Sequence, residues 1–460
     1  MKAVSCEYEV VRDTTWEEEM KKLIMLSLST AMMFSLAACS SGSSSSGESS
    51  GSATAAASGT GSVYYLNFKP EADSAWQELA KTYTEETGVE VKVVTAASGE
   101  YDTTLISELG KSAAPTMFNI GNAGAVATYG DYALDLTGTD VYNEMTTHSF
   151  DQVVDGYTYS IGYCYESYGI IVNKALLKEA GYEITDITNF DTLKTVAEDI
   201  HSRASELGFD AFTNAGLDGS SSWRFSGHLA NLPLYYTFKD MGQAMNVAPA
   251  EINDSYMDNY RAIWDLYINN STTDPVANNT ATGDAAESEF MEGKAVFYQN
   301  GTWEYSNLIA KLNAEDLQMI PIYIGVEGEE NSALASGTEN CWAVNKNASA
   351  EDQQATLDFM KWVVTSEAGT KMMAEQFGPI PFKSAATPEN VFFADANELL
   401  AEGKYNVDWA FNTTPNVDDW RAGVVSALQA YGADQSDANW DAVVDAFVNG
   451  WAVQYAAANN

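Results

Sequence analysis

The chain has 460 residues, of which 45% are hydrophobic and 12% aromatic, and its formal net charge is −42. This length and composition are typical of a globular protein of two or three domains and exclude a disordered chain. The negative charge argues against binding to nucleic acids or anionic membrane surfaces, which requires clusters of Lys and Arg, and indicates a well-solvated surface instead. The three histidines are far apart and no EF-hand spacing occurs, so we predict neither a metal site nor a cofactor.

The N-terminal region has the features of an export signal. From Met20 onward it contains two lysines, an apolar run over residues 23–34, and the tetrapeptide Leu36-Ala37-Ala38-Cys39. A basic segment, a short apolar segment and small residues before the cut are typical of a signal peptide, and the apolar run is too short for a transmembrane helix. The tetrapeptide resembles the lipobox of bacterial lipoproteins, which implies that Cys39 is acylated and becomes the mature N-terminus.

The first 19 residues do not fit this pattern, because three glutamates, Glu17 to Glu19, stand directly before Met20 and the lysines. We therefore hypothesise that Met20 is the true start, and we predict that residues 1–38 are an upstream leader and a lipoprotein signal peptide. An uncleaved anchor is the alternative. Residues 39–62 contain the predicted acylated Cys and a Ser/Gly-rich stretch, which predicts a flexible tether with a root-mean-square span of about 25 Å.

Strand and helix patterns alternate after the tether. Residues 63–68, 89–93 and 116–120 are rich in strand formers, and helical spacing of apolar residues separates them. Gly88 follows the first helical pattern and is expected to end it. Alternating strands and helices predict an α/β fold with a parallel, right-handed, doubly wound sheet.

Polar loops follow the three predicted strands. Lys69 and Glu71 follow the first strand, Tyr101 the second and Asn122 the third. Because the carboxyl ends of parallel strands meet at one edge of a sheet, these four residues are candidate ligand contacts. For each of them an ordinary solvated loop residue is the alternative.

The middle of the chain contains further aromatic candidates. Residues 220–225 are rich in Ser and are predicted to form a polar loop that includes Trp223 and Arg224. We expect this loop to contact a ligand, with packing at a domain edge as the alternative. Trp409 lies in another polar segment and is a further candidate, whereas Trp264 keeps helical spacing and is expected in the core.

One stretch resembles a family signature. Residues 290–303, FMEGKAVFYQNGTW, match the F-x-x-G-K-A…G-x-W pattern of the family 1 extracellular solute-binding proteins of ABC importers, the maltose and multiple-sugar type. The tetrapeptide Gly378-Pro379-Ile380-Pro381 also resembles a G-x-I-P motif that is common in this family. Two small departures occur: Asn189-Phe190-Asp191 stands where Pro-x-Thr-Trp is common, and Thr302 replaces a frequent Pro.

The resemblance implies a two-lobed, periplasmic-binding-protein-like fold of type II, in which each lobe is a doubly wound sheet flanked by helices and hinge strands join the lobes. We expect one lobe over residues 63–166 and 337–384, and the other over residues 167–336 and 385–460. The β-rich stretches 157–174 and 335–346 then correspond to the two crossovers between the lobes.

The resemblance also implies site residues. Glu166 matches a position at which maltose-binding relatives place a ligand carboxylate, Glu339 lies where the two lobes meet, and Trp420 lies where those relatives present an aromatic ring to the cleft. Trp303, at the strand-to-helix turn of the signature, is the residue most expected to touch the ligand. A solvated acid for Glu166 and a packed helix-start ring for Trp303 are the alternatives.

The function implied is that of a monomeric receptor, lipid-anchored on the outer face of the cytoplasmic membrane, that closes on a solute and delivers it to membrane permease subunits. The sequence has no phosphate-loop motif, so the ATPase is expected on separate chains. Apolar sugar faces stack on aromatic rings and hydroxyls pair with carboxylates and amides, so Trp303, Trp420, Trp223, Trp409, Glu166 and Asn122 predict an oligosaccharide ligand. A lipid-anchored glycoside hydrolase is the alternative function.

Two cysteines remain after signal removal and acylation. Cys164 and Cys341 fall in the two crossovers that the resemblance implies, which lie side by side in the family fold. A disulfide between them is therefore geometrically conceivable in an oxidising compartment, and two free thiols are the alternative.

Overall fold

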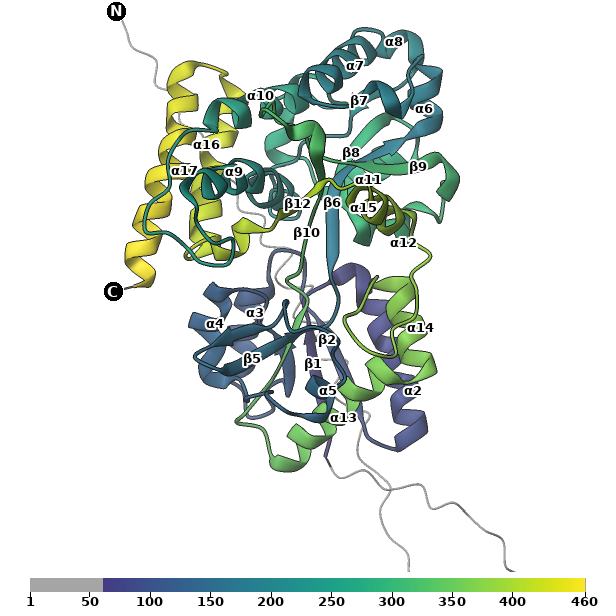
Figure 1. Cartoon of the computed structure of the whole chain (residues 1–460), viewed down its shortest axis with the longest axis vertical. Coiled ribbons are helices and arrows are strands. Elements are labelled where there is room, and N and C mark those ends of the chain that lie inside the picture. Colours follow the sequence, from purple (N-terminus) through teal and green to yellow (C-terminus); the bar gives the residue numbers. More distant parts are fainter. Residues whose placement is uncertain (1–60, 460) are drawn as a thin grey trace, which may run out of the picture. The chain divides into compact units, whose positions relative to one another are not determined.

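A computed structural model describes residues 61–459 of the chain. The predictions for the signal peptide, the true start, the acylated Cys39 and nearly all of the tether lie outside these described residues. The remainder forms an α/β structure with two six-stranded sheets, each flanked by helices (Figure 1).

The first sheet has the strand order β2-β1-β3-β11-β5-β4. Its strands β1, β2 and β3 are parallel, whereas β11 runs antiparallel to both of its neighbours, β3 and β5. Apolar side chains fill both faces of this sheet. The strands are β1 Val63–Asn67, β2 Val91–Thr95, β3 Met117–Asn119, β4 Gln152–Val154, β5 Tyr157–Gly162 and β11 Cys341–Val344. The helices of this part are α2 Asp73–Thr87, α3 Tyr101–Leu109, α4 Ala123–Tyr129, α5 Asp140–Asn143, α13 Ala350–Thr365 and α14 Glu367–Gln376.

The second sheet has the order β12-β10-β6-β8-β7, and β9 also pairs with β6. Its central strand β6 is buried along its whole length and runs antiparallel to β8, β9 and β10. The strands are β6 Glu166–Asn173, β7 Asp210–Phe212, β8 Ala295–Gly301, β9 Leu317–Ile320, β10 Ser332–Gly337 and β12 Tyr405–Asp408. The helices are α6 Lys174–Glu179, α7 Phe190–Ser202, α8 Ala204–Leu207, α9 Asn231–Met241, α10 Met257–Asn269, α11 Gly283–Met291, α12 Tyr305–Leu308, α15 Val391–Ala401, α16 Val417–Ala433 and α17 Asp437–Ala458.

Short helical turns complete the structure. The 3-10 turns are Pro70–Ala72, Gly130–Tyr132, Ile184–Asp186, Ala277–Thr280, Thr302–Glu304, Ala314–Asp316, Glu329–Asn331 and Ala410–Thr413. A π-helical turn, Arg224–Leu229, leads directly into α9. Trp264 is fully buried in α10, so its predicted core position is confirmed.

Helix boundaries follow local capping chemistry. The Asn122 side chain accepts from the backbone N–H of Ala125 at the start of α4, and Ser349 does the same for Asp352 in α13. Gly88 ends α2 in the left-handed conformation with φ 78°, which a residue with a Cβ adopts only at a cost. These signals are local, and the predicted end of the first helix at Gly88 is confirmed.

The structure corrects two sequence predictions of local structure. The first sheet is mixed, because β11 returns from the second half of the chain and pairs antiparallel with β3, which strand-helix alternation does not predict. Residues 220–225 do not form a simple loop, because Arg224 and Phe225 begin the π-helical turn. A Ser-rich stretch favours a helix start as readily as a loop.

Three crossings connect the two parts within the described residues; the last runs from α14 to α15, and the other two are short links between strands. The link 163–165 leads from β5 of the first sheet to β6 of the second, and the link 338–340 returns from β10 to β11. The two links are hydrogen-bonded: Thr338 Oγ1 donates to the Cys164 carbonyl at 2.6 Å and the Tyr163 N–H donates to the Asn340 carbonyl at 2.8 Å. Cys164 and Cys341 are buried free thiols in this structure, so the conceivable disulfide is not formed.

Trp420 is part of the packing between α16 and α17. Its side chain is 2% exposed, its ring meets Phe447 edge-on at 4.9 Å, and its Nε1 donates to the Phe447 carbonyl at 2.9 Å. Trp451 packs edge-on against the other side of the same ring at 6.1 Å. The residue therefore has a core role, with its one polar atom satisfied inside the protein.

Among residues 61–459, no helix is both long and apolar enough to cross a membrane, and no cluster of three or more His, Cys, Asp or Glu side chains is arranged to hold a metal ion.

Replacing Trp420 by Ala is expected to lower the free energy of unfolding by about 3–5 kcal/mol, because the change removes a large buried ring and leaves a cavity between two helices. Chemical denaturation of the variant measures this loss. Val453→Ala on the exposed side of α17, where the side chain is 63% exposed, is the matched control and should change stability by less than about 0.5 kcal/mol. Equal stabilities for the two variants would contradict the core role of Trp420.

Candidate functional site

A cavity of about 450 Å³ lies where loops of the first sheet meet elements of the second; we call it the main cavity. The loops after β1 and β2 contribute on one side, and the π-helical turn, α11 and the segment after β8 contribute on the other. The predicted site residues that line it are Lys69, Glu71, Glu166, Trp223, Arg224, Trp303, Glu339 and Trp409. It is the size of a small-molecule site.

Aromatic rings gather on one side of the main cavity. The five residues Trp223, His228, Trp303, Trp409 and Phe411, which we call the aromatic cluster, all line it. The His228 ring is 5.0 Å from Trp223, 5.4 Å from Trp303, 5.8 Å from Trp409 and 5.5 Å from Phe411, measured between ring centroids. The structure therefore brings together three tryptophans that are widely separated in the sequence.

The position of Trp303 depends on Gly301. A Cβ at residue 301 would lie 2.1 Å from Cη2 of the Trp303 ring, so only glycine allows the ring to lie against this point of the backbone. Trp409 is placed in the same way, because a Cβ at Gly337 would lie 2.6 Å from its ring. Two glycines at the ends of β8 and β10 thus let two rings approach the backbone closely at the cavity.

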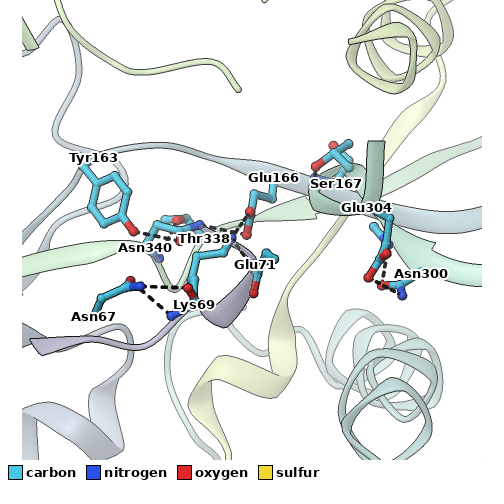
Figure 2. A network of polar contacts seen from close by, with 12 residues as sticks. Asn67, Lys69, Glu71, Tyr163, Glu166, Ser167, Asn300, Glu304, Thr338 and Asn340 are labelled. Atoms are coloured by element: carbon cyan, nitrogen blue, oxygen red, sulfur yellow. Dashed lines mark hydrogen bonds and ion pairs between the residues drawn. The ribbon is translucent and has the colours of Figure 1, made fainter. Parts of the chain in front are cut away.

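A buried ion pair joins Lys69 to Glu166. The two residues are 6% and 5% exposed, and Lys69 Nζ contacts Glu166 Oε1 and also lies 3.6 Å from Glu71 Oε1. Asn340 Nδ2 donates to the other oxygen, Glu166 Oε2, at 2.8 Å. Figure 2 shows Lys69 reaching toward Glu166, with Glu71 beside it. Although burial alone would lower it, the pKa of Lys69 is raised above its ordinary value by the Glu166 and Glu71 charges.

This network changes the interpretation of Glu166. Its carboxylate lines the main cavity, but both oxygens already accept hydrogen bonds from protein groups. Its primary interactions are therefore with Lys69 and Asn340. Burial raises the pKa of the nearby Glu71 carboxyl above its ordinary value, and the Lys69 charge opposes that rise.

Glu304 is a cavity residue that the sequence did not single out. Its Oε1 accepts from Asn300 Nδ2 at 2.9 Å, while its buried Oε2 has no hydrogen-bond partner among the described residues (Figure 2). Burial, followed by the charges of Glu287 and Glu71, raises the pKa of Glu304 to about 8. The carboxyl is therefore mostly neutral at pH 7 and has an O–H to donate.

A second cavity of about 440 Å³ shares lining residues with the main cavity, among them Glu339 and Arg421; we call it the adjoining cavity. Tyr101 and Asn122, two of the predicted strand-end residues, line it. Asn122 Nδ2 donates to Glu339 Oε1 at 3.3 Å, and burial raises the pKa of Glu339. The strand-end predictions thus fall into two groups, with Lys69 and Glu71 at the main cavity and Tyr101 and Asn122 at the adjoining one.

Polar and charged groups surround the adjoining cavity. Tyr129 Oη donates to Asp102 Oδ1 at 2.7 Å, and burial raises the pKa of Asp102 to about 6. Burial lowers the pKa of the Arg421 guanidinium, and the charges of Asp418 and Glu339 oppose this change. This cavity therefore offers charged hydrogen-bonding groups, in contrast to the rings of the main cavity.

Two of the predicted ligand contacts, Trp420 and Arg224, interact chiefly with other protein groups. Trp420 lines neither cavity, because it is held in the α16–α17 core described above. Arg224 reaches the main cavity but is 1% exposed, and its guanidinium donates to the Ser221 hydroxyl at 2.7 Å and to the Asn214 carbonyl at 3.1 Å. The Arg224 guanidinium therefore stabilises the start of the π-helical turn, and most of its N–H donors are not free to contact a ligand.

Sequence reasoning missed His228, Glu304 and Arg421. The wide spacing of the histidines argues only against a metal site, and the aromatic environment of His228 forms only when distant segments meet. Glu304 directly follows Trp303 in the sequence, so its place beside the signature was an available signal. Arg421 follows Trp420 on α16, where the helix turns these neighbouring side chains to different sides.

Chemically, the two cavities suit a neutral, hydroxyl-rich ligand with apolar faces. Rings supply stacking surfaces, and the Glu304, Glu339 and Asn122 side chains supply hydrogen-bonding groups next to them.

Known structures with the same fold include several solute-binding proteins. One is a structure described as the solute-binding protein RafE in complex with raffinose, which is 16% identical, with 84% of this chain and 98% of that chain covered and a TM-score of 0.67. Another, described as a chitin oligosaccharide binding protein, is 15% identical over 86% and 99% of the two chains, with a TM-score of 0.67. The GacH receptor of Streptomyces glaucescens, described both unliganded and with acarbose, is 18% identical, with 87% of this chain and 97% of that chain covered and a TM-score of 0.59.

These likenesses confirm the two-lobed α/β fold of the periplasmic-binding-protein kind that the sequence predicts. A family match reaches the same conclusion from the sequence: residues 78–402, more than half of the chain, match the family described as bacterial extracellular solute-binding protein. The chain therefore belongs to the bacterial extracellular solute-binding protein family.

Proposed function

We propose that this chain is the lipid-anchored, extracellular substrate-binding protein of an ABC importer and that its ligand is a carbohydrate, specifically an oligosaccharide. The observation that supports the proposal most is the main cavity, which is lined by three tryptophan rings and by several carboxyl groups. A pyranose ring has apolar C–H faces and a rim of hydroxyls, and this arrangement is complementary to both.

The two connected cavities favour an oligosaccharide over a single sugar. The main and adjoining cavities share five lining residues, so a ligand longer than one ring could extend from one into the other. RafE with raffinose, GacH with acarbose and the chitin oligosaccharide binding protein are similar folds whose described ligands are oligosaccharides. The likeness is one of fold, and the cavity chemistry is the independent support.

The proposed mechanism is closure of two lobes. Lys69 and Glu71 come from the first sheet, and Trp303 and Trp223 come from the part of the chain around the second. A ligand that contacts both groups stabilises the closed arrangement, because only there are both sets of contacts made. The closed receptor would then deliver the sugar to permease subunits in the membrane, with ATP hydrolysed by separate chains.

A panel of glycans tests the proposal. We expect residues 61–460, produced without the signal and tether, to bind at least one neutral oligosaccharide in calorimetric titrations, and to return it unchanged after prolonged incubation. Binding of a peptide or a polyamine with no response to any sugar would contradict the carbohydrate ligand. Release of shorter sugars would instead support a glycoside hydrolase.

Trp303→Ala sharpens this test once a glycan is found. Removing the ring deletes a stacking face but no structural hydrogen bond, so we expect affinity to fall about ten- to one-hundred-fold, equivalent to roughly 1.4–2.8 kcal/mol. The matched control is Trp362→Ala, since Trp362 lies on α13 and lines neither cavity. Unchanged affinity in the Trp303 variant would exclude the main cavity as the binding site.

Lipid anchoring is proposed from Cys39 and its preceding Leu36-Ala37-Ala38 alone. We expect mass spectrometry of the protein isolated from its own membranes to find an N-terminal peptide that begins at Cys39 and bears fatty acyl groups. Cys39→Ser should release the protein into the medium or leave it as an unprocessed precursor. An unmodified peptide that spans residues 38 and 39 in the mature wild-type protein would contradict the anchor.

Glu304 predicts how stability depends on pH. Its pKa is raised to about 8 by burial, so the native state retains a proton that the unfolded chain releases above its ordinary pKa of about 4.3. The wild-type protein therefore loses stability as pH rises from about 4.3 toward 8, and Glu304→Gln does not undergo this loss.

We expect the stability of Glu304→Gln relative to the wild type to increase by about 2–4 kcal/mol between pH 4.5 and pH 8.5, as measured by chemical denaturation at both pH values. Glu251→Gln, at an exposed carboxyl, is the control for loss of one negative charge. If the relative stability of Glu304→Gln is the same at both pH values, Glu304 is ionised at neutral pH and cannot act there as a donor.

A further inference from the structure

We propose that His228 is a specificity-determining contact of the main cavity, and that its Nε2–H donates a hydrogen bond to an oxygen atom of a neutral sugar held against the aromatic cluster. The inference rests on the proposed carbohydrate function. It goes beyond that function by naming one polar atom that selects among sugars.

The first support is where the fold places the ring. His228 lies in the π-helical turn Arg224–Leu229, whose backbone hydrogen bonds span one more residue than those of an α-helix, which changes the direction of its side chains. The imidazole stacks on Tyr168 of β6, with 4.1 Å between ring centroids and 3° between planes. This stacking and the other four rings of the aromatic cluster hold His228 in one orientation at the cavity.

The second support is the state of the two ring nitrogens. His228 is 8% exposed, and its Nδ1 is buried without a hydrogen-bond partner among the described residues. Nε2 also has no hydrogen-bond partner within residues 61–459, but it is not fully enclosed, so it retains access to the cavity that the residue lines. A buried polar side chain that makes no hydrogen bond inside the protein is uncommon, and Nε2 can be satisfied by a ligand.

The third support is the charge of the ring. Burial, together with the positive charges of Arg421 and Arg224, lowers the pKa of His228 well below its ordinary value. The imidazole is therefore neutral and carries a single N–H. An enclosed N–H without an acceptor is costlier than an enclosed lone pair, so the proton belongs on Nε2 and the bare nitrogen is Nδ1.

These observations define the ligand chemistry at this point. Nε2–H requires an acceptor, such as a hydroxyl, ring or carbonyl oxygen of the sugar. A deoxy sugar that lacks this oxygen leaves the donor unpaired in a dry cavity, and an ammonium group offers only further donors. The site is thus expected to reject amino sugars whose charged nitrogen occupies this position.

The test compares a bound glycan with its monodeoxy analogues, using calorimetry on the wild type and on His228→Phe. Phe retains the stacking on Tyr168 but has no donor. We expect the wild type to bind one particular deoxy analogue about ten- to one-hundred-fold more weakly than the parent sugar, and His228→Phe to bind the two nearly equally. His201→Phe is the control, since His201 is hydrogen-bonded to Asp210 and lines neither cavity.

The outcomes separate the two proposals. No glycan binding by the wild type overturns both the carbohydrate function and the role of His228. Glycan binding with the same deoxy pattern in His228→Phe as in the wild type overturns the role of His228 alone. If His228→Phe does not fold, nitrogen NMR of histidine-labelled wild type replaces this variant. We expect a neutral ring that is protonated at Nε2, and we expect the Nε2 resonance to shift when the glycan is added. An unshifted resonance overturns the proposal.

Discussion

The buried ion pair between Lys69 and Glu166 is the interaction on which the site depends. Both charges have left water, which is costly, and the cost is offset only while each has its partner and further hydrogen bonds. Lys69 lies in the loop after β1, and Glu166 lies at the start of β6. Asn340, in the link between β10 and β11, donates a hydrogen bond to the second carboxylate oxygen of Glu166. One network therefore joins the first sheet to the start of β6 and to the link 338–340, and Lys69 and Glu166 both line the main cavity. Removing one partner alone would leave an unpaired buried charge, which lowers the free energy of unfolding by about 3–5 kcal/mol.

The aromatic side of the cavity is built on a different constraint, the close approach of rings to glycine backbone. Gly301 and Gly337 end β8 and β10, and each lies against a tryptophan ring where no Cβ would fit. This gives the family signature in residues 290–303 a physical meaning. Phe290 is fully buried against Tyr298, Gly293 has a positive φ of 69° between α11 and β8, and Gly301 makes room for the Trp303 ring. The residues of this pattern thus position the Trp303 ring, just after β8, at the main cavity.

Local signals account for the parts of the fold that the sequence predicts well. Capping side chains such as Asn122 and Ser349, and the left-handed Gly88, act within a few residues of the boundaries they set. Pairing between strands is decided by segments far apart, which is why the return of β11 beside β3 and the resulting mixed sheet were not predictable from alternation. Trp420 shows the same limit for side chains. A tryptophan after a polar turn resembles a cleft residue in sequence, and only the arrival of α17 determines that it is covered.

For the site, sequence reasoning predicted residue types at strand ends but not which of their atoms remain free. Glu166 and Glu304 are both glutamates beside the main cavity, yet Glu166 is satisfied at both oxygens by Lys69 and Asn340, whereas Glu304 has an unpartnered Oε2 and a pKa raised to about 8. Burial and the charges of Glu287 and Glu71 outweigh the opposing charge of Arg224 and raise the pKa of Glu304, and burial beside two arginines lowers the pKa of His228. The chain as a whole is strongly acidic, but these two groups present uncharged donors to the cavity. The negative net charge therefore affects the solvated surface. Selection of a neutral ligand depends instead on the few cavity groups that are uncharged because they are buried.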